Sequence, residues 1–407
     1  MIRTLLAASL LLLPIAAHAE EPQPATVVVA FDGEGIRPLI VEGVRNRDTG
    51  QPIEANDPVR IASISKLIMA LATLRLVDEG KVALDADVSD YLGWQVRSPN
   101  FPDAKVTLAQ LLSHRSGLRD NAGYVIPLGE SLEAKLADPE AWYADAPPGE
   151  APFEYANLGS PLVATVLEAA TGERYDRLLE RTVFAPLGIE ACANWVGCEE
   201  DMIANAVTLY RATGEIARDD PNGLPPHCTI PVAERVECSL DNYVPGTNAS
   251  IFSPQGGVRI GMMDLAKIGQ AILTEDEKFV SGEAILAMKR SIDDQLETPN
   301  SPEQDFFCIY GFGFQAIDME NSPCVDSLFA DGVPRIGHAG EAYGLRSGLW
   351  FAPDEGAEGE PIWGTGIAYF TTEVPPRQSA EDEGGFDPRE IALMERAKEL
   401  LAAKSSD

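Results

Sequence analysis

The 407-residue chain has few metal-binding residues and little positive charge. It contains four histidines, one of them in the N-terminal segment, and neither a C-x-x-C nor an H-E-x-x-H motif. A metal site is therefore not expected. Lys and Arg number 31 against 64 Asp and Glu, which gives a formal net charge of −33. This charge argues against nucleic acids and anionic lipid surfaces as partners.

Long apolar runs are almost absent. One run, residues 5–17, follows the basic Arg3 and precedes the small-residue sequence Ala17-His18-Ala19. This pattern predicts a secretory signal peptide, residues 1–19, that is removed after Ala19. The run is too short for a transmembrane helix, and no other segment is long enough. We therefore expect no transmembrane segment and an exported protein, periplasmic in the first instance or else secreted.

The six cysteines fall into three pairs that are close in the sequence, and export favours disulfide bonds between them. Other connectivities are possible, but the local pairings are the simplest hypothesis. The predicted disulfides are Cys192–Cys198, Cys228–Cys238 and Cys308–Cys324.

The order of the predicted elements indicates an α+β fold. Residues 26–44 read as a β-hairpin, and the last helix begins after Asp387 with Pro388 in its first turn. The simplest packing is an antiparallel sheet flanked by helices, with a mostly helical lobe beside it and a cleft between them. Further helices are predicted at residues 64–79, 106–113, 160–170, 175–185, 262–274 and 282–290, and further strands at 344–351 and 363–370.

After the signal peptide, residues 20–407 read as a single functional domain with two regions. The α/β region is predicted at residues 20–85 and 275–407, and the helical region at 86–274. Residues 190–247 are irregular, rich in proline and carry four of the six cysteines, so they read as an insertion held by disulfides.

The candidate nucleophile is Ser63, which lies where the helix of residues 64–79 should begin. Lys66 follows three residues later, so the hydroxyl and the amine can meet on one helix face. The helix N-terminus also offers free N–H groups beside a developing negative charge. The S-x-x-K pattern alone is weak, and by itself it would favour an ordinary helix cap at Ser63.

Two other stretches could complete a site with this pair. Tyr155 and Asn157 alternate in an extended loop, so both side chains can point the same way. A phenol held toward phenolate by Lys66 could act as a base, and Asn157 could bind a substrate carbonyl. His338, within the glycine-containing residues 336–341, could donate to the substrate. Taken singly, Tyr155 and His338 could each be ordinary buried residues.

Together these stretches resemble the serine β-lactamase and penicillin-binding-protein superfamily. The similarity is to the branch of class C β-lactamases, serine DD-peptidases, related esterases and D-amino-acid peptidases. It rests on Ser-Ile-Ser-Lys at 63–66, Tyr-Ala-Asn at 155–157 and His-Ala-Gly at 338–340, in the family's order. Residues 111–118 and 253–257 add support. The resemblance covers nearly all of the mature chain, and its fold agrees with the α+β expectation.

The resemblance implies acyl transfer through an acyl-enzyme on Ser63, with proton transfer shared by Lys66 and Tyr155. Asn157 would orient the substrate, and His114 would belong to a structural loop. The expected substrate is a small molecule, a peptide or an ester, and no metal or organic cofactor is implied. D-amino-acid peptides and esters are favoured, with weak β-lactamase activity as the alternative.

The third motif departs from the β-lactamase pattern. Its first residue is His338 instead of lysine, as in some DD-peptidases and D-aminopeptidases. Ala339 offers no donor, whereas threonine is common there, and Gly340 is followed by Glu341. By the resemblance, these residues orient the substrate, and the backbone N–H groups of Ser63 and Glu341 form the oxyanion hole.

A Glu341 carboxylate facing the cleft would repel substrates that carry a free carboxylate. Arg346 or Arg335 could neutralise it. We therefore expect ester or D-amino-acid amide hydrolysis in preference to strong β-lactamase activity. A non-catalytic relative that binds cell-wall fragments or a protein is a weaker alternative, since all three catalytic candidates are intact. The chain has no G-x-S-x-G motif, which disfavours an α/β-hydrolase.

Overall fold

The computed structural model describes residues 23–219, 230–297, 306–319, 324, 326–352, 364–375 and 385–404, with backbone only for 293–297. The predicted signal peptide and Cys228 lie outside these ranges, so the signal peptide and the Cys228–Cys238 disulfide stay predictions. The other two predicted disulfides, Cys192–Cys198 and Cys308–Cys324, are confirmed.

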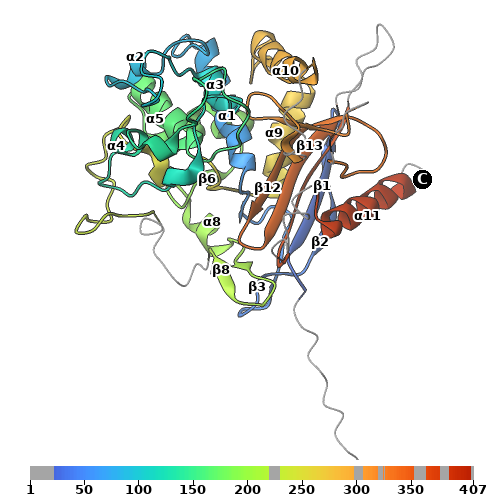
Figure 1. The fold of residues 1–407 in the computed structure, drawn as a ribbon. Coiled ribbons are helices and arrows are strands. Elements are labelled where there is room, and N and C mark those ends of the chain that lie inside the picture. The colour runs from blue at the N-terminus through green and yellow to red at the C-terminus, as the bar shows by residue number, and fades with distance from the viewer. Residues whose placement is uncertain are drawn as a thin grey trace, which may run out of the picture.

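The main sheet of the described chain has seven antiparallel strands and combines the two ends of the chain (Figure 1). Strand β1, for example, pairs with β14 through Thr26 and Thr371. This arrangement confirms the predicted α+β fold. In sheet order the strands are β10 (Ile309–Tyr310), β11 (Gln315–Ile317), β12 (Arg335–Ala342), β13 (Leu345–Ala352), β14 (Thr365–Thr371), β1 (Thr26–Asp32) and β2 (Ile36–Glu42).

Both faces of the sheet are covered, because apolar side chains point alternately to its two sides. On β13, Leu349 and Phe351 belong to the large core shared with α1 (Ile64–Asp78), whereas Trp350 belongs to a smaller core. That smaller core is closed by α11 (Pro388–Lys404) through residues such as Leu393 and Met394. Figure 1 shows α11 on the outer face of the sheet.

Helix α9 (Met262–Leu273) packs against the inner face of the sheet, on β1, β13 and β14. A Cβ atom at Gly269 would lie 2.4 Å from Phe31 Cζ, which shows how closely α9 approaches the strands. Our boundary at residue 275 therefore falls too late, because the helix of residues 262–274 packs with the α/β region. Its periodicity predicted a helix but carried no information about its packing partner.

Helix α1 lies between the sheet and the helical region, and it is buried on almost every side. A helix in such a position is expected to be apolar all round. Lys66 is therefore enclosed by hydrophobic residues such as Leu67 and Met69. On the opposite side of α1 lie the short helices of the helical region and α5 (Gly159–Thr171), which ends at Gly172 in the left-handed region.

The remaining elements are short helices and small sheets, together with the longer α10, which packs against β10 and α1. The helices are α2 (Ser89–Leu92), α3 (Leu108–Leu112), α4 (Leu132–Leu136), α6 (Tyr175–Leu179), α7 (Ala185–Leu187), α8 (Glu200–Ala204) and α10 (Gly282–Glu297). The strands are β3 (Val44–Asn46), β4 (Gln51–Pro52), β5 (Val59–Arg60), β6 (Ala191–Ala193), β7 (Leu209–Tyr210), β8 (Ile216–Arg218) and β9 (Val258–Ile260).

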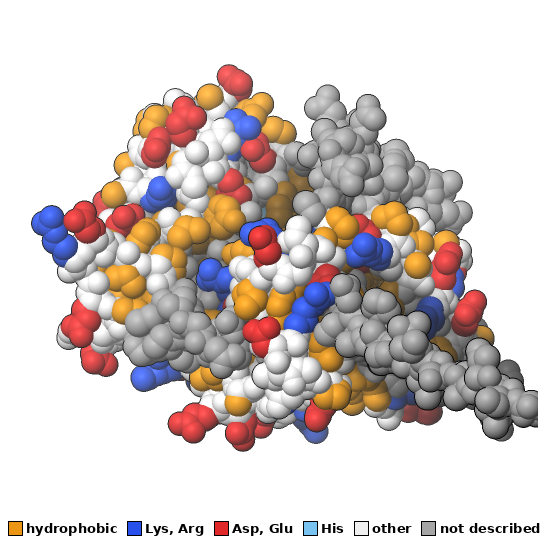
Figure 2. All heavy atoms as spheres, turned by 90° about the horizontal axis from the view of Figure 1, so that it is seen from below, with side chains coloured by type: hydrophobic (Ala, Val, Ile, Leu, Met, Phe, Trp, Pro, Cys, Tyr) orange, Lys and Arg blue, Asp and Glu red, His pale blue; other side chains and the backbone are white. Residues whose placement is uncertain are grey.

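Figure 2 shows Asp and Glu side chains scattered over one face of the molecule, among Lys, Arg and hydrophobic side chains. They do not form a single acidic patch on this face. Among the described residues, no helix has the length and apolar character needed to cross a bilayer.

Candidate active site

The backbone is strained at the residue that precedes Ser63. Ala62 has a φ of 49°, in the left-handed region that non-glycine residues seldom adopt. This turn joins β5 to α1 and places Ser63 at the helix N-terminus. The Ser63 hydroxyl makes no capping hydrogen bond, so it is not used as an ordinary helix cap. Strain of this kind is often found at active sites.

Lys66 reaches Ser63 as the i, i+3 spacing predicts. Its Nζ atom is 3.2 Å from Ser63 Oγ, 2.9 Å from Asn157 Oδ1 and 3.1 Å from the carbonyl oxygen of Gln255. The side chain is fully buried, and burial lowers the pKa of Lys66 to about 7, although the negative charge of Asp120 acts in the opposite direction. A large share of Lys66 is therefore an uncharged amine at neutral pH.

The three partners of Lys66 determine what happens when it loses a proton. Asn157 Oδ1 and the Gln255 carbonyl can only accept hydrogen bonds, so they take the two hydrogens of the neutral amine. The nitrogen lone pair is then left for the Ser63 hydroxyl. The geometry can thus accept the proton of Ser63.

Asp120, in a short 3₁₀ turn (Asp120–Ala122), fixes Asn157. Its Oδ2 accepts hydrogen bonds from the Asn157 backbone N–H at 3.0 Å and from Nδ2 at 2.9 Å, and Oδ1 accepts from the Leu158 N–H at 2.9 Å. The carboxylate therefore orients the amide so that its oxygen faces Lys66. Sequence reasoning missed Asp120, which belongs to no recognisable pattern, and it gave the Gln255 carbonyl no role although residues 253–257 supported the resemblance.

Tyr155 lies beside Lys66, whose Nζ is 4.6 Å from the centre of the phenol ring. The Phe307 ring stacks on Tyr155 with 4.1 Å between the ring centres, and the centre of the His114 ring is 4.5 Å from that of Tyr155. The phenol oxygen is buried and makes no hydrogen bond of normal geometry in the described part of the chain. Burial raises the pKa of Tyr155, although the Ser63 hydroxyl lowers it in part. Tyr155 is therefore a neutral phenol at neutral pH, contrary to our phenolate hypothesis.

His114 holds the Tyr155 stretch from behind. Its Nδ1 accepts a hydrogen bond from the Ala156 N–H at 3.2 Å, and its carbonyl oxygen accepts one from the Glu154 N–H at 3.1 Å. Burial, followed by the positive charge of Lys66, places the pKa of His114 well below its usual value. His114 thus lies where a structural residue is expected.

His338 is fully buried in β12 and does not line the cleft. Its Nδ1 is 2.6 Å from the Ala339 carbonyl oxygen, which can only accept, so Nδ1 carries the hydrogen. Nε2 then accepts a hydrogen bond from the Tyr310 hydroxyl at 2.9 Å. Burial lowers the pKa of His338 to about 3. The structure therefore places a neutral His338 behind the site, away from the direct substrate contact that we expected.

Gly340 allows β12 to approach the turn before Ser63. A Cβ atom at Gly340 would lie 2.4 Å from the Ile61 carbonyl oxygen and 2.3 Å from Ser347 Oγ. The Ser347 hydroxyl itself donates to the Ile61 oxygen at 3.0 Å. The third motif and the nucleophile therefore lie side by side, as an oxyanion hole at Ser63 and Glu341 requires.

The Glu341 side chain lies on the α11 side of the sheet. Its carboxylate is 2.6 Å from Arg346 Nη1, and Arg346 Nε is 3.8 Å from Glu390 of α11. Arg346 is buried, whereas the Glu341 side chain is about half exposed. Of the two arginines that we considered, Arg346 pairs with Glu341, while Arg335 bonds to Asp331. The ion pair weakens the repulsion that a substrate anion would meet.

A cleft of about 1260 Å³ joins these residues. Of the predicted site residues, it is lined by Ser63, Tyr155, Asn157, Ala339, Gly340 and Glu341. Sequence reasoning gave no site role to several other residues that line the cleft, among them Arg60, Arg119, Glu154, Arg218, Phe306, Phe307 and Tyr343. Among the described residues, no group of three or more His, Cys, Asp or Glu side chains could hold a metal ion.

Comparison with known proteins identifies the family. A family model described as Beta-lactamase matches residues 19–387. The chain belongs to this family. Penicillin-binding protein 4 of Amycolatopsis lactamdurans is 23% identical over 359 residues, which are 88% of this chain and 85% of that protein. Esterase EstB of Burkholderia gladioli is 32% identical over 194 residues, or 44% of this chain and 49% of its own length.

The fold of this β-lactamase family member is also found in solved structures. The D-amino acid amidase of Ochrobactrum anthropi SV3, complexed with L-phenylalanine, superposes with a TM-score of 0.64 at 17% identity, over 94% of each chain. These comparisons support a serine hydrolase of the β-lactamase fold.

Proposed function

We propose that the protein hydrolyses an ester or amide bond through an acyl-enzyme on Ser63. The observation that carries this proposal is the contact of Ser63 Oγ with Lys66 Nζ at 3.2 Å, in surroundings that lower the pKa of Lys66 to about 7. A neutral amine with its lone pair toward a serine hydroxyl is an effective general base near neutral pH.

In the first step, Lys66 takes the Ser63 proton while Oγ forms a bond to the substrate carbonyl carbon. The negative charge on the carbonyl oxygen is stabilised by the N–H groups of Ser63 and Glu341. When the tetrahedral intermediate collapses, the bond to the leaving group breaks. The neutral phenol of Tyr155 gives the leaving group its proton and regains one from the Lys66 ammonium. Water then cleaves the acyl-enzyme in the same sequence of transfers.

The third motif favours substrates without a carboxylate at this position. His338 is buried and uncharged, and Ala339 has no donor. Arg346 is already paired with Glu341. An ester or a D-amino-acid amide therefore fits better than a β-lactam, and an esterase and a D-amino acid amidase are among the similar proteins. The two disulfides favour an exported protein, as the signal-peptide prediction does.

The first test is intact-mass spectrometry after treatment with a fluorophosphonate. The wild type should gain one adduct, and Ser63→Ala should gain none. A wild type that stays unlabelled would contradict the proposal and favour the non-catalytic alternative. Treatment with penicillin then separates the substrate classes. A lasting adduct would favour a DD-peptidase, and rapid turnover of nitrocefin would favour a β-lactamase. If penicillin leaves no adduct and nitrocefin is not turned over, esters and D-aminoacyl amides are the expected substrates.

A further inference from the structure

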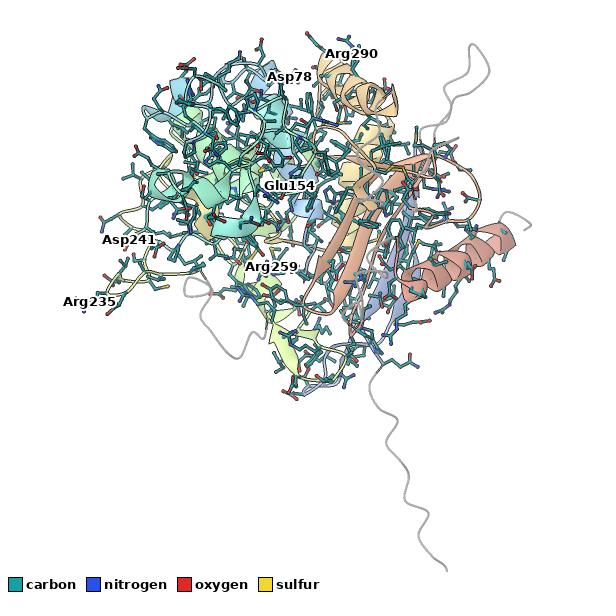
Figure 3. The ribbon with its side chains drawn as sticks, in the orientation of Figure 1. Asp78, Glu154, Arg235, Asp241, Arg259 and Arg290 are labelled. Atoms are coloured by element: carbon teal, nitrogen blue, oxygen red, sulfur yellow. A yellow bond between two sulfur atoms is a disulfide. The ribbon has the colours of Figure 1, made fainter. Side chains whose placement is uncertain are left out.

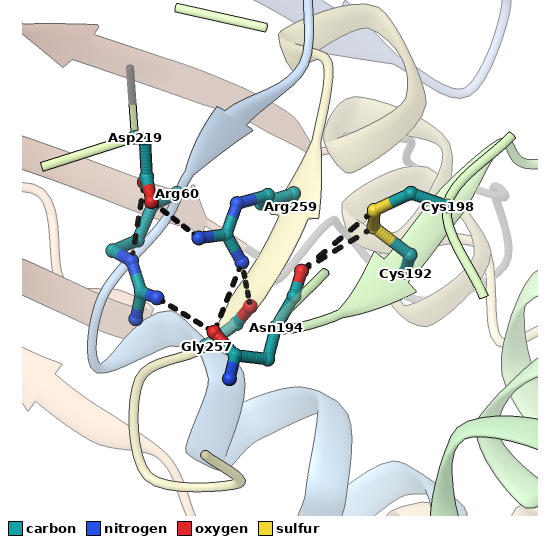
Figure 4. Close-up of a disulfide and its surroundings, with 7 residues drawn as sticks. All are labelled: Arg60, Cys192, Asn194, Cys198, Asp219, Gly257 and Arg259. Carbon is teal, nitrogen blue, oxygen red and sulfur yellow. Dashed lines mark hydrogen bonds and ion pairs between the residues drawn. A yellow bond between two sulfur atoms is a disulfide. The ribbon is translucent and has the colours of Figure 1, made fainter. Parts of the chain in front are cut away.

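A cluster of arginines stands at one end of the cleft and has no part in the acyl transfer described above. Arg60 and Arg259 share the carboxylate of Asp219, with Arg60 Nε 3.3 Å from Asp219 Oδ2 (Figure 4). The Asn194 carbonyl oxygen Oδ1 accepts from Arg60 Nη2 at 3.0 Å and from Arg259 Nη1 at 3.4 Å. All three charged side chains are at most 4% exposed.

This buried group carries a net positive charge. Burial alone would raise the pKa of Asp219, but Arg259 and Arg60 outweigh it and hold the pKa below its usual value. Burial lowers the pKa of Arg259 to about 9, which still leaves it charged at neutral pH. Two guanidinium groups thus face one carboxylate. The Arg259 position within the molecule is labelled in Figure 3.

Arg218, at the end of β8, adds a third guanidinium on the surface of the cleft. Its side chain is 38% exposed, and its Nε atom is 3.9 Å from Asp219 Oδ1, too far for a hydrogen bond. The guanidinium carbon lies 5.6 Å from the centre of the Tyr343 ring, and that of Arg60 lies 5.7 Å from the same ring. The backbone of Arg218 pairs with β7, but its side chain makes no hydrogen bond to the described residues.

The other arginines of the cleft are already neutralised by an acid. Arg119 Nε bonds to Glu154 at 2.7 Å, and Arg346 pairs with Glu341. At the Arg218 end, in contrast, three arginines share Asp219, which leaves an excess of positive charge in the described part of the cleft. The excess stands out in a chain with a formal net charge of −33.

The geometry points to a binding site for an anionic group of the substrate, a carboxylate, between Arg218 and Tyr343. The inference rests on the proposed hydrolase function and names a substrate class for the same cleft. A guanidinium presents a planar pair of N–H donors that matches a carboxylate, and the Tyr343 ring lies within cation–π distance of it. The buried Arg60 and Arg259 add attraction without needing to touch the ligand.

The site also adjoins the nucleophile. Arg60 Nη1 donates to the carbonyl oxygen of Gly256 at 2.8 Å, and the preceding residue, Gln255, accepts from Lys66. Ser63 and Arg218 line the same cleft, so a substrate bound at Arg218 can extend to the nucleophile. The carboxylate would lie at the turn between β12 and β13, just beyond the third motif, whose His338 and Ala339 side chains offer it no donor.

The test compares three nitrophenyl esters with acyl chains of equal length. These are the half-ester of adipic acid, which is anionic, the hexanoate, which is neutral, and the 6-aminohexanoate, which is cationic. We expect kcat/KM to decrease in that order. In Arg218→Gln the ratio of kcat/KM for the anionic ester to that for the neutral ester should fall about tenfold, the value of one charge-assisted hydrogen bond. The ratio in the wild type should also fall with added salt.

Arg211→Gln is the matched control. Arg211 lies in the same β7–β8 hairpin and is exposed, but it does not line the cleft. In Arg211→Gln the ratio of kcat/KM for the anionic ester to that for the neutral ester should equal the wild-type ratio. An unchanged ratio in Arg218→Gln, or an equal fall in both variants, would overturn the inference.

Binding to Ser63→Ala, measured by titration calorimetry, separates this inference from the hydrolase proposal. Tighter binding of the anionic ester than of the neutral one supports the site even if the wild type turns over neither. Equal binding refutes the site even if both esters are hydrolysed.

Discussion

The Lys66 amine is surrounded by as many acceptors as an ammonium group has hydrogens. An ammonium in this position is satisfied by Ser63, Asn157 and Gln255, but it is still costly because it is fully buried. Loss of one proton removes that cost. Only the hydrogen bond with Ser63 must then change direction, so that the hydroxyl donates to the amine. The single lysine can therefore alternate between proton acceptor and proton donor without any rearrangement of its neighbours.

Replacement of Asp120 by asparagine should shift the pH dependence of catalysis. Only the neutral amine of Lys66 can act as the base, so wild-type kcat/KM should rise with pH through about 7. The negative charge of Asp120 raises the pKa of Lys66, so its removal in Asp120→Asn should lower that pKa and move the rise to lower pH. The maximal rate should fall about tenfold, because Asn157 loses its orientation.

The measurement is a pH profile of kcat/KM for a neutral ester. Asp103→Asn, an exposed position, serves as the control and should keep the wild-type midpoint. A shift of Asp120→Asn to higher pH, or none, would contradict the role given to Asp120.

For single residues, the sequence predicts only contacts between residues that are close in the chain. The contact between Ser63 and Lys66 follows from a spacing of three residues on one helix. The role of Asp120 could not be predicted, because it arises from bonds to a segment 37 residues away. The burial of His338 likewise depends on Tyr310, which no motif connects with it.

Among the elements, β12 and the start of α1 form the closest functional contact. Their approach is possible because Gly340 has no side chain, so the Ile61 carbonyl oxygen can lie against the strand. The strained Ala62 follows directly and turns the chain into the helix. The distance between nucleophile and oxyanion hole is thus set by backbone contacts.

Gly340→Ala should separate β12 from Ser63. The new methyl group would lie 2.4 Å from the Ile61 oxygen, so the strand must move. We expect kcat/KM to fall at least about tenfold and the free energy of unfolding to fall by about 1–3 kcal/mol, the usual cost of overpacking. Gly35→Ala is the control, because its Cβ would meet no atom within 4 Å. Wild-type activity in Gly340→Ala, measured together with urea unfolding, would contradict this account.

The sequence predicted elements with strong end signals better than their packing. Thr107 caps α3 through a capping box with Gln110, and Gly172 ends α5 in the left-handed region. Both signals are contained in a few adjacent residues. The attachment of α9 to the sheet depends on Gly269 fitting against Phe31, more than 200 residues earlier, and no local pattern carries that information.

For the whole molecule, the formal charge of −33 means that the acidic side chains repel one another and destabilise the folded state. Folding brings 64 acidic side chains closer together than in the extended chain, and salt screens their repulsion. The family and fold could be predicted at this scale, because three ordered motifs and the sequence of elements span nearly the whole chain. The charge distribution of the cleft could not be predicted, because it depends on which arginine forms an ion pair with which acidic side chain.

Added salt should therefore stabilise the protein. Raising NaCl from about 0.05 M to about 0.5 M should increase Tm by about 2 °C, which corresponds to roughly 1 kcal/mol. Calorimetry at neutral pH measures the change, and KCl should act like NaCl if screening is the cause. A decrease in Tm would show that attractive ion pairs outweigh the repulsion.

The pairing of β1 with β14 also determines when the protein can fold. Thr26 bonds to Thr371 across a separation of 345 residues. At a synthesis rate of about 5–20 residues per second, β1 waits roughly 20–70 s for this neighbour. Until then the central sheet lacks β13 and β14, and the face that α9 covers stays incomplete. The central sheet therefore cannot close until most of the chain has been synthesised, and chaperones can bind its unpaired strands until then.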